Sequence, residues 1–362
     1  MPFSAARPIT RRHALRQTFF YSAALALGSR TVPIEAEELS PTDHHFLMLG
    51  DFGSHGQNAA HTIEPQVESS AASEPAAAGA ATPEPKIPWT PQQMPVAMAM
   101  QAYVQAARIR AEGLFMLGDN FYGPFPGGVN CPRWKTGFED MYPADVFPGP
   151  CWAMLGNHDY DEDSGRKLAA EMEYAEAHPG TRWTMPAKWY RVDWPAKNPV
   201  ITALILDSNY KNSYIYLTSE EKAKQLKWLT LQLARPRTAP WMVCMGHHPI
   251  YSNGMHGDNQ GLIKDWAPLF QENNVACYFS GHDHDLQHLE FDGASTSFVI
   301  SGGGGAHVTK LTKPRRGLFS QSVNGFSHLQ VSPEKLTVRH IDPQGQVLHA
   351  FSRTPDGRVA TS

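Results

Sequence analysis

The chain has 362 residues, of which 41% are hydrophobic and 18% are charged, and this composition excludes a disordered or fibrous protein. The length allows one large domain with additions, or two domains. Because the formal net charge is −4, no basic excess exists to neutralise a phosphate backbone, and we expect no nucleic-acid partner. The apolar runs are too short for a membrane span, and four cysteines are too few to build a disulfide scaffold.

Residues 1–36 have the parts of an export signal. Arg11 and Arg12 precede a short apolar run, and small residues follow it. Paired arginines before a modest apolar run are typical of a twin-arginine signal, which predicts recognition by export machinery and a periplasmic or extracellular protein. Cleavage after Ala26 and cleavage after Ala36 fit the pattern equally. The alternative interpretation is a surface amphipathic helix in which the arginines are incidental.

Residues 57–93 change in composition to Ala, Pro, Glu and Ser. Such a segment cannot bury enough apolar surface to offset the entropy lost on ordering, so we predict a flexible insert. Because it follows a turn that contains Asp51, it is either a lid over a site at that turn or a loop without a role. The remainder of residues 43–350 is predicted to fold as one domain, with residues 351–362 as a C-terminal tail.

Short apolar runs alternate with helical patterns along this domain. Strand, polar loop and helix in alternation are typical of layered α/β proteins, in which ligands bind at the carboxyl ends of the strands. The last third favours antiparallel strands. The predicted strands are residues 46–49, 114–117, 153–155, 201–206, 242–245, 275–279, 298–301, 326–331 and 336–341, and the predicted helices are residues 94–110, 219–234 and 258–273.

Eight side chains with metal-binding chemistry lie at or just past the ends of predicted strands. Carboxylates, imidazoles, an amide and a phenol form a mixed oxygen and nitrogen set that suits borderline transition metals. A single aspartate after a strand is more often a turn residue, and a single buried histidine is more often a core residue. Eight together favour a metal site. They are Asp51, Asp119, Tyr122, Asn157, His158, His247, His282 and His284.

Five motifs resemble those of the metallophosphoesterases of the calcineurin-like superfamily, in the same order along the chain. The set is most similar to the purple acid phosphatases, especially the small tartrate-resistant type, because general metallophosphoesterases lack a tyrosine at the position of Tyr122. The resemblance implies an α/β fold, a four-layer α/β/β/α sandwich of two mixed β-sheets flanked by helices. The motifs are Gly50-Asp51-Phe52-Gly53, Gly118-Asp119-Asn120-Phe121-Tyr122, Gly156-Asn157-His158-Asp159, Gly246-His247-His248-Pro249 and Gly281-His282-Asp283-His284.

The resemblance also implies two metal ions bridged by the carboxylate of Asp119. Asp51, Tyr122 and His284 would complete an Fe(III) site, and Asn157, His247 and His282 would complete a site for divalent Fe, Zn or Mn. The division agrees with ligand chemistry, because a hard trivalent ion prefers anionic oxygens and a softer divalent ion accepts imidazole and amide. Such a pair generates metal-bound hydroxide as the nucleophile, and trivalent iron would allow hydroxide to form at acidic pH as well. The implied reaction is hydrolysis of phosphate monoesters, with a small phosphate ester as substrate.

Three residues are candidates for contact with the substrate. His158 and His256 correspond to residues that hold the phosphate and protonate the leaving group, and an imidazole titrates near pH ~6.5, which suits a proton donor in mild acid. For His256 the alternative is a histidine in a surface loop. Asn120 is a candidate substrate contact because it follows the bridging aspartate. Asp159 and Asp283 are candidates for orienting the neighbouring imidazoles.

Two departures from the family pattern leave the ligands intact: Cys244, where the family usually has valine, and the insert. Cys131 and Cys151 are candidates for a disulfide if the protein is exported. Gly302–Gly305 lacks the Lys-Ser/Thr of a phosphate loop, so we predict a tight bend near the site. Two other functions remain open: a phosphodiesterase or nucleotide hydrolase with a Mn or Zn pair, and a non-catalytic binding protein, which would lack ligands.

Overall fold

The structure is a computed structural model that describes residues 43–54, 91–160, 165–210, 217–312 and 316–361. The predicted export signal and nearly all of the predicted insert lie outside the described residues. The chain divides into two units, residues 1–40 and residues 41–362, and the fold below is that of the second unit.

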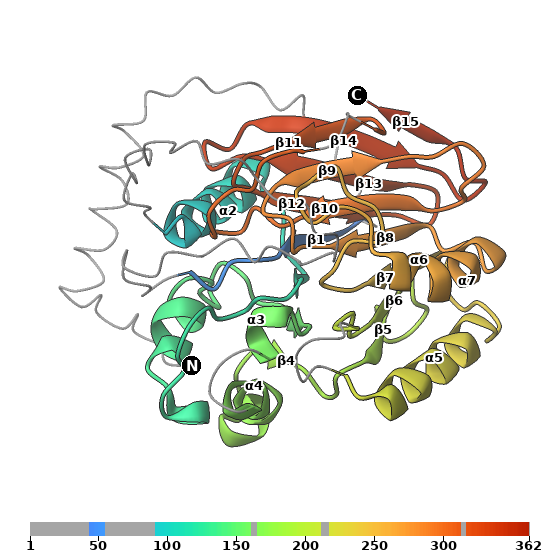
Figure 1. Cartoon of the computed structure of the whole chain (residues 1–362). Coiled ribbons are helices and arrows are strands. Elements are labelled where there is room, and N and C mark those ends of the chain that lie inside the picture. The colour runs from blue at the N-terminus through green and yellow to red at the C-terminus, as the bar shows by residue number, and fades with distance from the viewer. Residues whose placement is uncertain (1–42, 55–90, 161–164, 211–216, 313–315, 362) are drawn as a thin grey trace, which may run out of the picture. The chain divides into compact units, whose positions relative to one another are not determined.

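Two mixed β-sheets form the centre of this unit (Figure 1). Within the described residues, the first sheet has eight strands in the order β15-β14-β13-β12-β1-β2-β3-β4. Strands β1 to β4 run parallel, and the others pair antiparallel. The strands are β1 (His44–Leu49), β2 (Gly113–Met116), β3 (Cys151–Ala153), β4 (Trp183–Thr184), β12 (Phe326–Val331), β13 (Leu336–Ile341), β14 (Val347–Arg353) and β15 (Val359–Thr361).

The second sheet has seven strands among the described residues, in the order β11-β9-β10-β8-β7-β6-β5. Its central strands β6, β7, β8 and β10 are parallel, and β5, β9 and β11 are antiparallel to their neighbours. The strands are β5 (Tyr190–Trp194), β6 (Ile201–Ile205), β7 (Trp241–Met245), β8 (Cys277–Ser280), β9 (Leu286–Leu289), β10 (Ser297–Ser301) and β11 (Phe319–Gln321).

Helices pack on the outer faces of the two sheets. Residues of α2 and α4 share a buried cluster with the first sheet, and residues of α5, α6 and α7 share another with the second sheet. Figure 1 shows α5, α6 and α7 together on one side of the molecule. The helices are α2 (Gln93–Ala107), α3 (Asn157–Tyr160), α4 (Arg166–Ala177), α5 (Ser219–Leu233), α6 (Gln260–Asp265) and α7 (Ala267–Glu272), with a 3-10 turn at Gly128–Asn130 and a π-helical segment at Trp134–Glu139.

The side chains of single strands show how the layers are built. In β1, Phe46 and Met48 lie in the cluster between the two sheets, whereas Leu47 and Leu49 pack with α2. This alternation is the period of two that a strand buried on both faces requires. In β6, Leu204 packs on the other side, with α5. Three buried clusters therefore separate four layers, and the predicted α/β/β/α sandwich is confirmed.

Several predicted boundaries differ from the structure, and three of the differences follow. The predicted helix 258–273 is two helices that meet at Trp266, because Pro268 lacks an N–H donor and cannot continue the turn before it. Residues 351–361 are not a tail, since β14 and β15 extend the first sheet. Helix α2 begins at Gln93, the last residue of the predicted insert.

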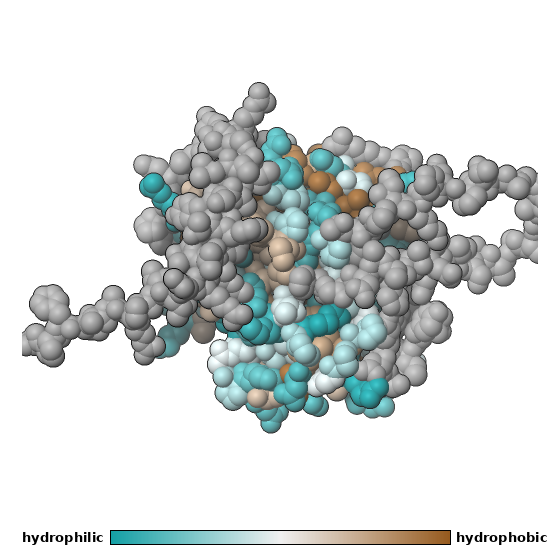
Figure 2. Space-filling view, turned by 90° about the vertical axis from the view of Figure 1, so that its left-hand side faces the viewer, coloured by the Kyte–Doolittle hydropathy of each residue, from teal (hydrophilic) through white to brown (hydrophobic). Residues whose placement is uncertain are grey.

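No helix within the described residues is long and apolar enough to cross a membrane. On the face drawn in Figure 2, the visible described residues mix hydrophilic and hydrophobic types.

Candidate metal centre

The predicted ligands come together where strands of both sheets end. Asp51, Asp119 and Asn157 follow β1, β2 and β3 of the first sheet, and His247 and His282 follow β7 and β8 of the second. Backbone hydrogen bonds join these strand ends: Asp51 N donates to Gly118 O at 2.9 Å, and Gly281 N donates to His247 O at 2.9 Å. The parallel strands therefore deliver five predicted ligands to one edge, as this class of fold favours.

Three of these residues have strained backbones. The φ angles of Asp51, Asp119 and His282 are 60°, 52° and 70°, in the left-handed region that side chains other than glycine rarely adopt. Such a conformation costs on the order of 1–3 kcal/mol and is concentrated at functional sites. The surrounding fold therefore stabilises these three side chains in positions that an unstrained turn would not give.

Glycines let the backbone approach the ligands closely. A Cβ atom on Gly156 would lie 2.2 Å from Asp119 Oδ1, and one on Gly281 would lie 2.5 Å from Asp51 Oδ2. A Cβ on Gly302 would lie 2.9 Å from Asp51 Oδ2, so the glycine run after β10 passes directly behind this carboxylate. The motifs therefore have glycine at these positions because a side chain would collide with the carboxylates. The predicted bend at Gly302–Gly305 lies at the site.

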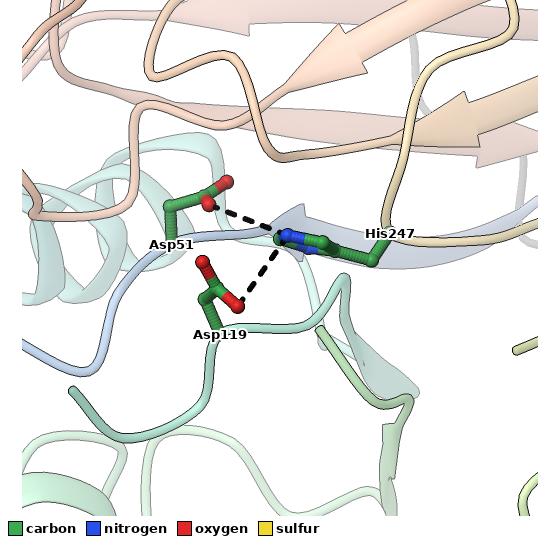
Figure 3. A group of neighbouring side chains, drawn as sticks. All are labelled: Asp51, Asp119 and His247. Carbon is green, nitrogen blue, oxygen red and sulfur yellow. Dashed lines mark ion pairs between the residues drawn. The ribbon is translucent and has the colours of Figure 1, made fainter. Parts of the chain in front are cut away.

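The centre of the site is formed by three fully buried side chains, Asp51, Asp119 and His247 (Figure 3). His247 Nε2 lies 3.4 Å from Asp119 Oδ1 and 4.0 Å from Asp51 Oδ1. One ligand atom of each residue lies within 4.8 Å of those of the other two, which is close enough for all three to contact one metal ion.

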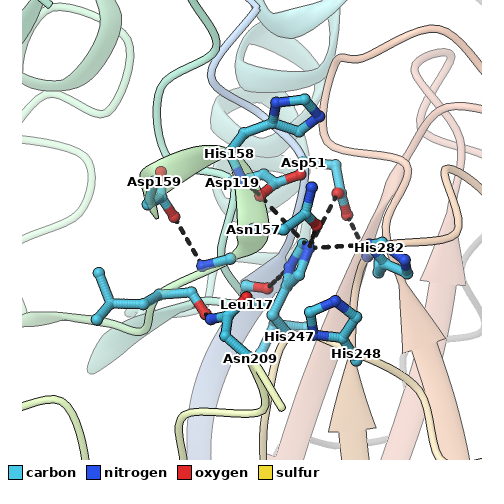
Figure 4. Close-up of polar contacts among 12 residues, drawn as sticks. Asp51, Leu117, Asp119, Asn157, His158, Asp159, Asn209, His247, His248 and His282 are labelled. Atoms are coloured by element: carbon cyan, nitrogen blue, oxygen red, sulfur yellow. Dashed lines mark hydrogen bonds and ion pairs between the residues drawn. The ribbon is translucent and has the colours of Figure 1, made fainter. Parts of the chain in front are cut away.

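The hydrogen bonds of His247 show that this centre suits a cation. His247 Nδ1 donates to Leu117 O at 2.8 Å, so the lone pair of Nε2 points into the site. There it faces Asn157 Oδ1 at 3.1 Å and His282 Nδ1 at 3.3 Å as well as Asp119 (Figure 4). We call Asp119, Asn157, His247 and His282 the His247 group. Its lone pairs converge, and only a proton or a metal ion between them relieves their repulsion.

The pKa values of the two histidines agree with that arrangement. Burial disfavours the charged form of His247, but the carboxylates of Asp119 and Asp51 outweigh it and raise its pKa to about 10. Burial, together with the neighbouring imidazoles of His256 and His248, holds the pKa of His282 well below its ordinary value. His282 is therefore neutral, as a ligand must be, whereas His247 carries a proton that a metal ion would replace.

A second set is formed by Asp51, Tyr122 and His284, and we call it the Tyr122 group. The Tyr122 hydroxyl donates to Asp51 Oδ1 at 3.3 Å and lies 3.2 Å from His284 Nε2. His284 Nδ1 donates to His307 O at 2.6 Å, which turns Nε2 toward the site. Burial and the charges of Asp119 and Asp51 raise the pKa of Tyr122 well above its ordinary value, so the phenol ionises only beside a strong cation.

The seven predicted ligands therefore lie together in two neighbouring sets, and Asp51 lies near members of both. The residues fit a pair of metal ions in donor chemistry, burial and orientation. The assignment of each set to a particular metal stays a prediction.

His256 and His158 lie at the edges of the two groups. His256 Nδ1 donates to the buried Asp283 at 2.8 Å, and its ring centroid lies 4.1 Å from that of His282. The backbone N–H of His158 donates to Asp119 Oδ1 at 2.9 Å, and its ring centroid lies 4.6 Å from that of Tyr122. His256 is thus an oriented side chain beside the site, which favours the functional interpretation over a surface loop histidine.

Asn120 does not lie where a substrate contact was predicted. Its amide is fully buried, and Nδ2 lies 2.9 Å from Met154 O, 3.1 Å from Asp159 Oδ2 and 2.9 Å from Glu171 Oε2. These acceptors occupy both amide hydrogens, so Asn120 belongs to the support of the loop. The prediction of a substrate contact is replaced by this role.

Two further features were unclear from the sequence. All four cysteines are free and buried, so Cys131 and Cys151 do not pair. Arg133, which no motif includes, donates to Tyr122 O at 2.6 Å and to Gly53 O at 2.8 Å and so ties the loops after β1 and β2 together. Nothing in its sequence context distinguishes this arginine from one on the surface.

A two-sheet α/β/β/α sandwich with aspartate, histidine and asparagine side chains at its strand ends is typical of the metallophosphoesterase class. Residues 98–286 match the calcineurin-like phosphoesterase family, and the chain belongs to that family of enzymes. The family resemblance found in the motifs is confirmed.

Named relatives agree with this placement. The chain is 29% identical over 264 residues to tartrate-resistant acid phosphatase type 5 of Mus musculus, covering 67% of this chain and 78% of that protein. It is 28% identical over 274 residues to purple acid phosphatase 3 of Arabidopsis thaliana, covering 71% of this chain and 72% of that protein.

Two solved structures share the fold. One is GAP50, the anchor in the inner membrane complex of Plasmodium, with a TM-score of 0.65, 20% identity and coverage of 85% of this chain and 88% of that one. The other is a purple acid phosphatase from yellow lupin seeds, with a TM-score of 0.62, 16% identity and coverage of 86% and 54%.

Proposed function

We propose that this enzyme is an acid phosphatase that hydrolyses phosphate monoesters with Fe(III) and a divalent Fe, Zn or Mn ion. The observation that carries the proposal is the position of Tyr122, whose hydroxyl lies beside Asp51 and His284 in a buried set of oxygen and nitrogen ligands. Relatives named as acid phosphatases support the reaction.

In this proposal the Tyr122 group, together with Asp119, would hold the trivalent ion, and the His247 group would hold the divalent ion. When bound, the two ions supply Lewis acidity to the phosphoryl oxygens and lower the pKa of water from about 15.7 toward about 7. The chain supplies the positions of the ligands. Leu117 O and His307 O fix the orientation of the His247 and His284 imidazoles, and the glycines behind Asp51 and Asp119 fix the carboxylates.

The protein groups that move protons are His256 and His158. Because Asp283 accepts from His256 Nδ1, the Nε2 atom of His256 is the one that gives a proton to the leaving alkoxide. The His256 side chain is 38% exposed, so it exchanges protons with solvent between turnovers. His158, whose ring lies against that of Tyr122, would contact the phosphate.

The visible absorption spectrum of the purified protein, beside a Tyr122→Phe variant, tests this proposal. We expect a broad band that is lost in the variant, iron by metal analysis, and faster hydrolysis of an aryl phosphate monoester than of the matching diester at pH 5. A colourless protein that contains Mn or Zn and prefers the diester would contradict the proposal and favour a phosphodiesterase. A protein with neither metal nor turnover would favour a binding protein.

We also propose that the N-terminal segment directs export to the periplasm or the extracellular space. The paired Arg11 and Arg12 before an apolar run support this. An Arg11→Lys, Arg12→Lys double variant should remain in the cytoplasmic fraction, and unchanged export of that variant would contradict a twin-arginine route.

A further inference from the structure

The loop from Asp119 to Tyr122 contributes two predicted ligands but forms no helix or strand. Its backbone groups therefore need hydrogen-bond partners from elsewhere in the chain. Asp159 Oδ1 accepts from Asn120 N at 2.8 Å and from Phe121 N at 3.3 Å. Tyr122 N donates to Gly53 O at 3.1 Å. The amides of Asn120, Phe121 and Tyr122 are thus satisfied by helix α3 and by the loop after β1.

Helix α4 binds the Phe121 carbonyl of the same loop, the Gly123 carbonyl just after the loop, and the Asn120 side chain. Lys167 Nζ donates to Phe121 O at 2.8 Å and to Gly123 O at 3.4 Å. Glu171 Oε2 accepts from Asn120 Nδ2 at 2.9 Å. Residues four apart lie on one face of a helix, so Lys167 and Glu171 together present one polar patch of α4 to the loop.

This polar patch is buried, which argues against a role in stability alone. Lys167 is 1% exposed, and Glu171 and Asp159 are 0% exposed. Removing an ammonium or a carboxylate from water costs several kcal/mol, and well-packed apolar residues at such positions are often as stable or more stable. Buried polar groups that bind one irregular segment contribute instead to fixing its conformation.

We propose that Lys167 and Glu171 are positioning residues, which hold the Asp119–Tyr122 loop in the one conformation that brings the Asp119 carboxylate and the Tyr122 phenol to the metal pair. Lys167 acts on the backbone beside Tyr122, and Glu171 acts on Asn120, next to Asp119. The part of this inference that concerns metal rests on the proposed function, whereas the ordering of the loop does not.

Hydrogen exchange of the metal-free full-length protein tests the ordering. The variants are Lys167→Met and Glu171→Leu, with Glu171→Gln as the conservative change that keeps an acceptor for Asn120. Arg353→Met is the matched control, because Arg353 is also buried and donates to Ser297 Oγ, but it lies on β14. In a peptide covering residues 118–123, we expect exchange about tenfold faster in Lys167→Met and Glu171→Leu, and within about twofold of wild type in Glu171→Gln.

Metal binding by the same proteins tests the consequence. We expect affinity for Zn²⁺ to fall about 10–100-fold in Lys167→Met and Glu171→Leu, as for other residues that orient ligands, and the tyrosinate band to shift or weaken. Arg353→Met should lower the melting temperature without changing the affinity for Zn²⁺ or the tyrosinate band. Wild-type exchange in both loop variants would overturn the inference, as would equal effects in the control. A wild-type protein that binds no metal would refute the proposed function, while the exchange data would still decide the ordering.

Discussion

Acid should destabilise this protein through His340, which lies between the sheets far along the chain from the metal centre. Its ring is fully buried, Nδ1 lies 2.9 Å from Ser327 Oγ, and Nε2 lies 3.1 Å from Gln287 O. Burial, together with the nearby imidazoles of His349 and His288, lowers its pKa to about 3. The native state therefore keeps His340 neutral at a pH where the unfolded chain protonates it.

The magnitude follows from the difference in proton binding. The unfolded histidine titrates near pH ~6.5, so above that pH neither state gains a proton and His340 has no pH-dependent effect on stability. Below it, the unfolded state binds the proton and the native state does not until about pH 3. At pH 5, about 1.5 units below the unfolded pKa and at about 1.36 kcal/mol per unit, the free energy of unfolding falls by about 2 kcal/mol.

Urea unfolding at pH 7.5 and at pH 5.0 measures this loss, with His340→Asn as the test and Ser327→Ala as the control. Ser327→Ala removes a partner of His340 but keeps the imidazole, so it should lower stability at both pH values by a similar amount. Between the two pH values, His340→Asn should lose about 2 kcal/mol less than wild type, because groups common to both proteins cancel. Equal losses in His340→Asn and wild type would refute the reasoning.

Three further predictions concern the metal centre. Gly156→Ala should reduce metal affinity at least about tenfold, because its Cβ would lie 2.2 Å from Asp119 Oδ1; Gly137→Ala, whose Cβ would have only ordinary contacts, should bind like wild type. Metal titration of the two variants checks this, and similar affinities would contradict it. His256→Asn should lower kcat for a phosphate ester about 10²–10⁴-fold at unchanged metal content, measured by steady-state kinetics and metal analysis, and loss of metal would instead make it a ligand. Because the pKa of His247 is about 10 in the metal-free site, loading that site should release about one proton between pH 6 and pH 8, measured by calorimetry in two buffers of different ionisation enthalpy. A proton count near zero would show that His247 is already neutral.

The ends of these strands could be predicted from the sequence because the signal for each one lies in a few consecutive residues. An apolar run that stops at Gly-Asp or Gly-His marks both a buried strand and the turn after it, and β1, β2 and β7 lie where these runs predicted them. Strand β9 was missed because Leu286-Gln287-His288-Leu289 has no apolar run, although all four side chains are buried. Its polar side chains are satisfied by the flanking Asp285 and Glu290 and by Ser252 and His349, which are distant in the sequence.

The residues that support the site were less predictable from the sequence. Their roles depend on where their side chains point in the fold, and not on their positions in the sequence. Asn120 stands next to a ligand in the sequence, but its amide points to α4 and not to the site. Lys167 and Glu171, four residues apart, have the pattern of a solvated ion pair on a helix surface, and only the fold shows that this face of α4 is buried under a ligand loop. A helix pattern indicates which residues share a face, and the tertiary structure decides what that face meets.

The pKa values of the histidines could not be predicted from the sequence for the same reason, because they depend on neighbouring groups in the folded structure. His284 and His288 are four residues apart in the sequence, and both are largely buried. His284 Nε2 lies 3.5 Å from Asp51, whose charge outweighs burial and raises the pKa of His284 to about 9. For His288, burial outweighs the charge of Glu290, and its pKa is lowered. A cluster of carboxylates thus makes histidines that attract cations, whereas burial among aromatic rings and imidazoles makes histidines that exclude protons. Acid should therefore weaken the fold around the second kind of histidine.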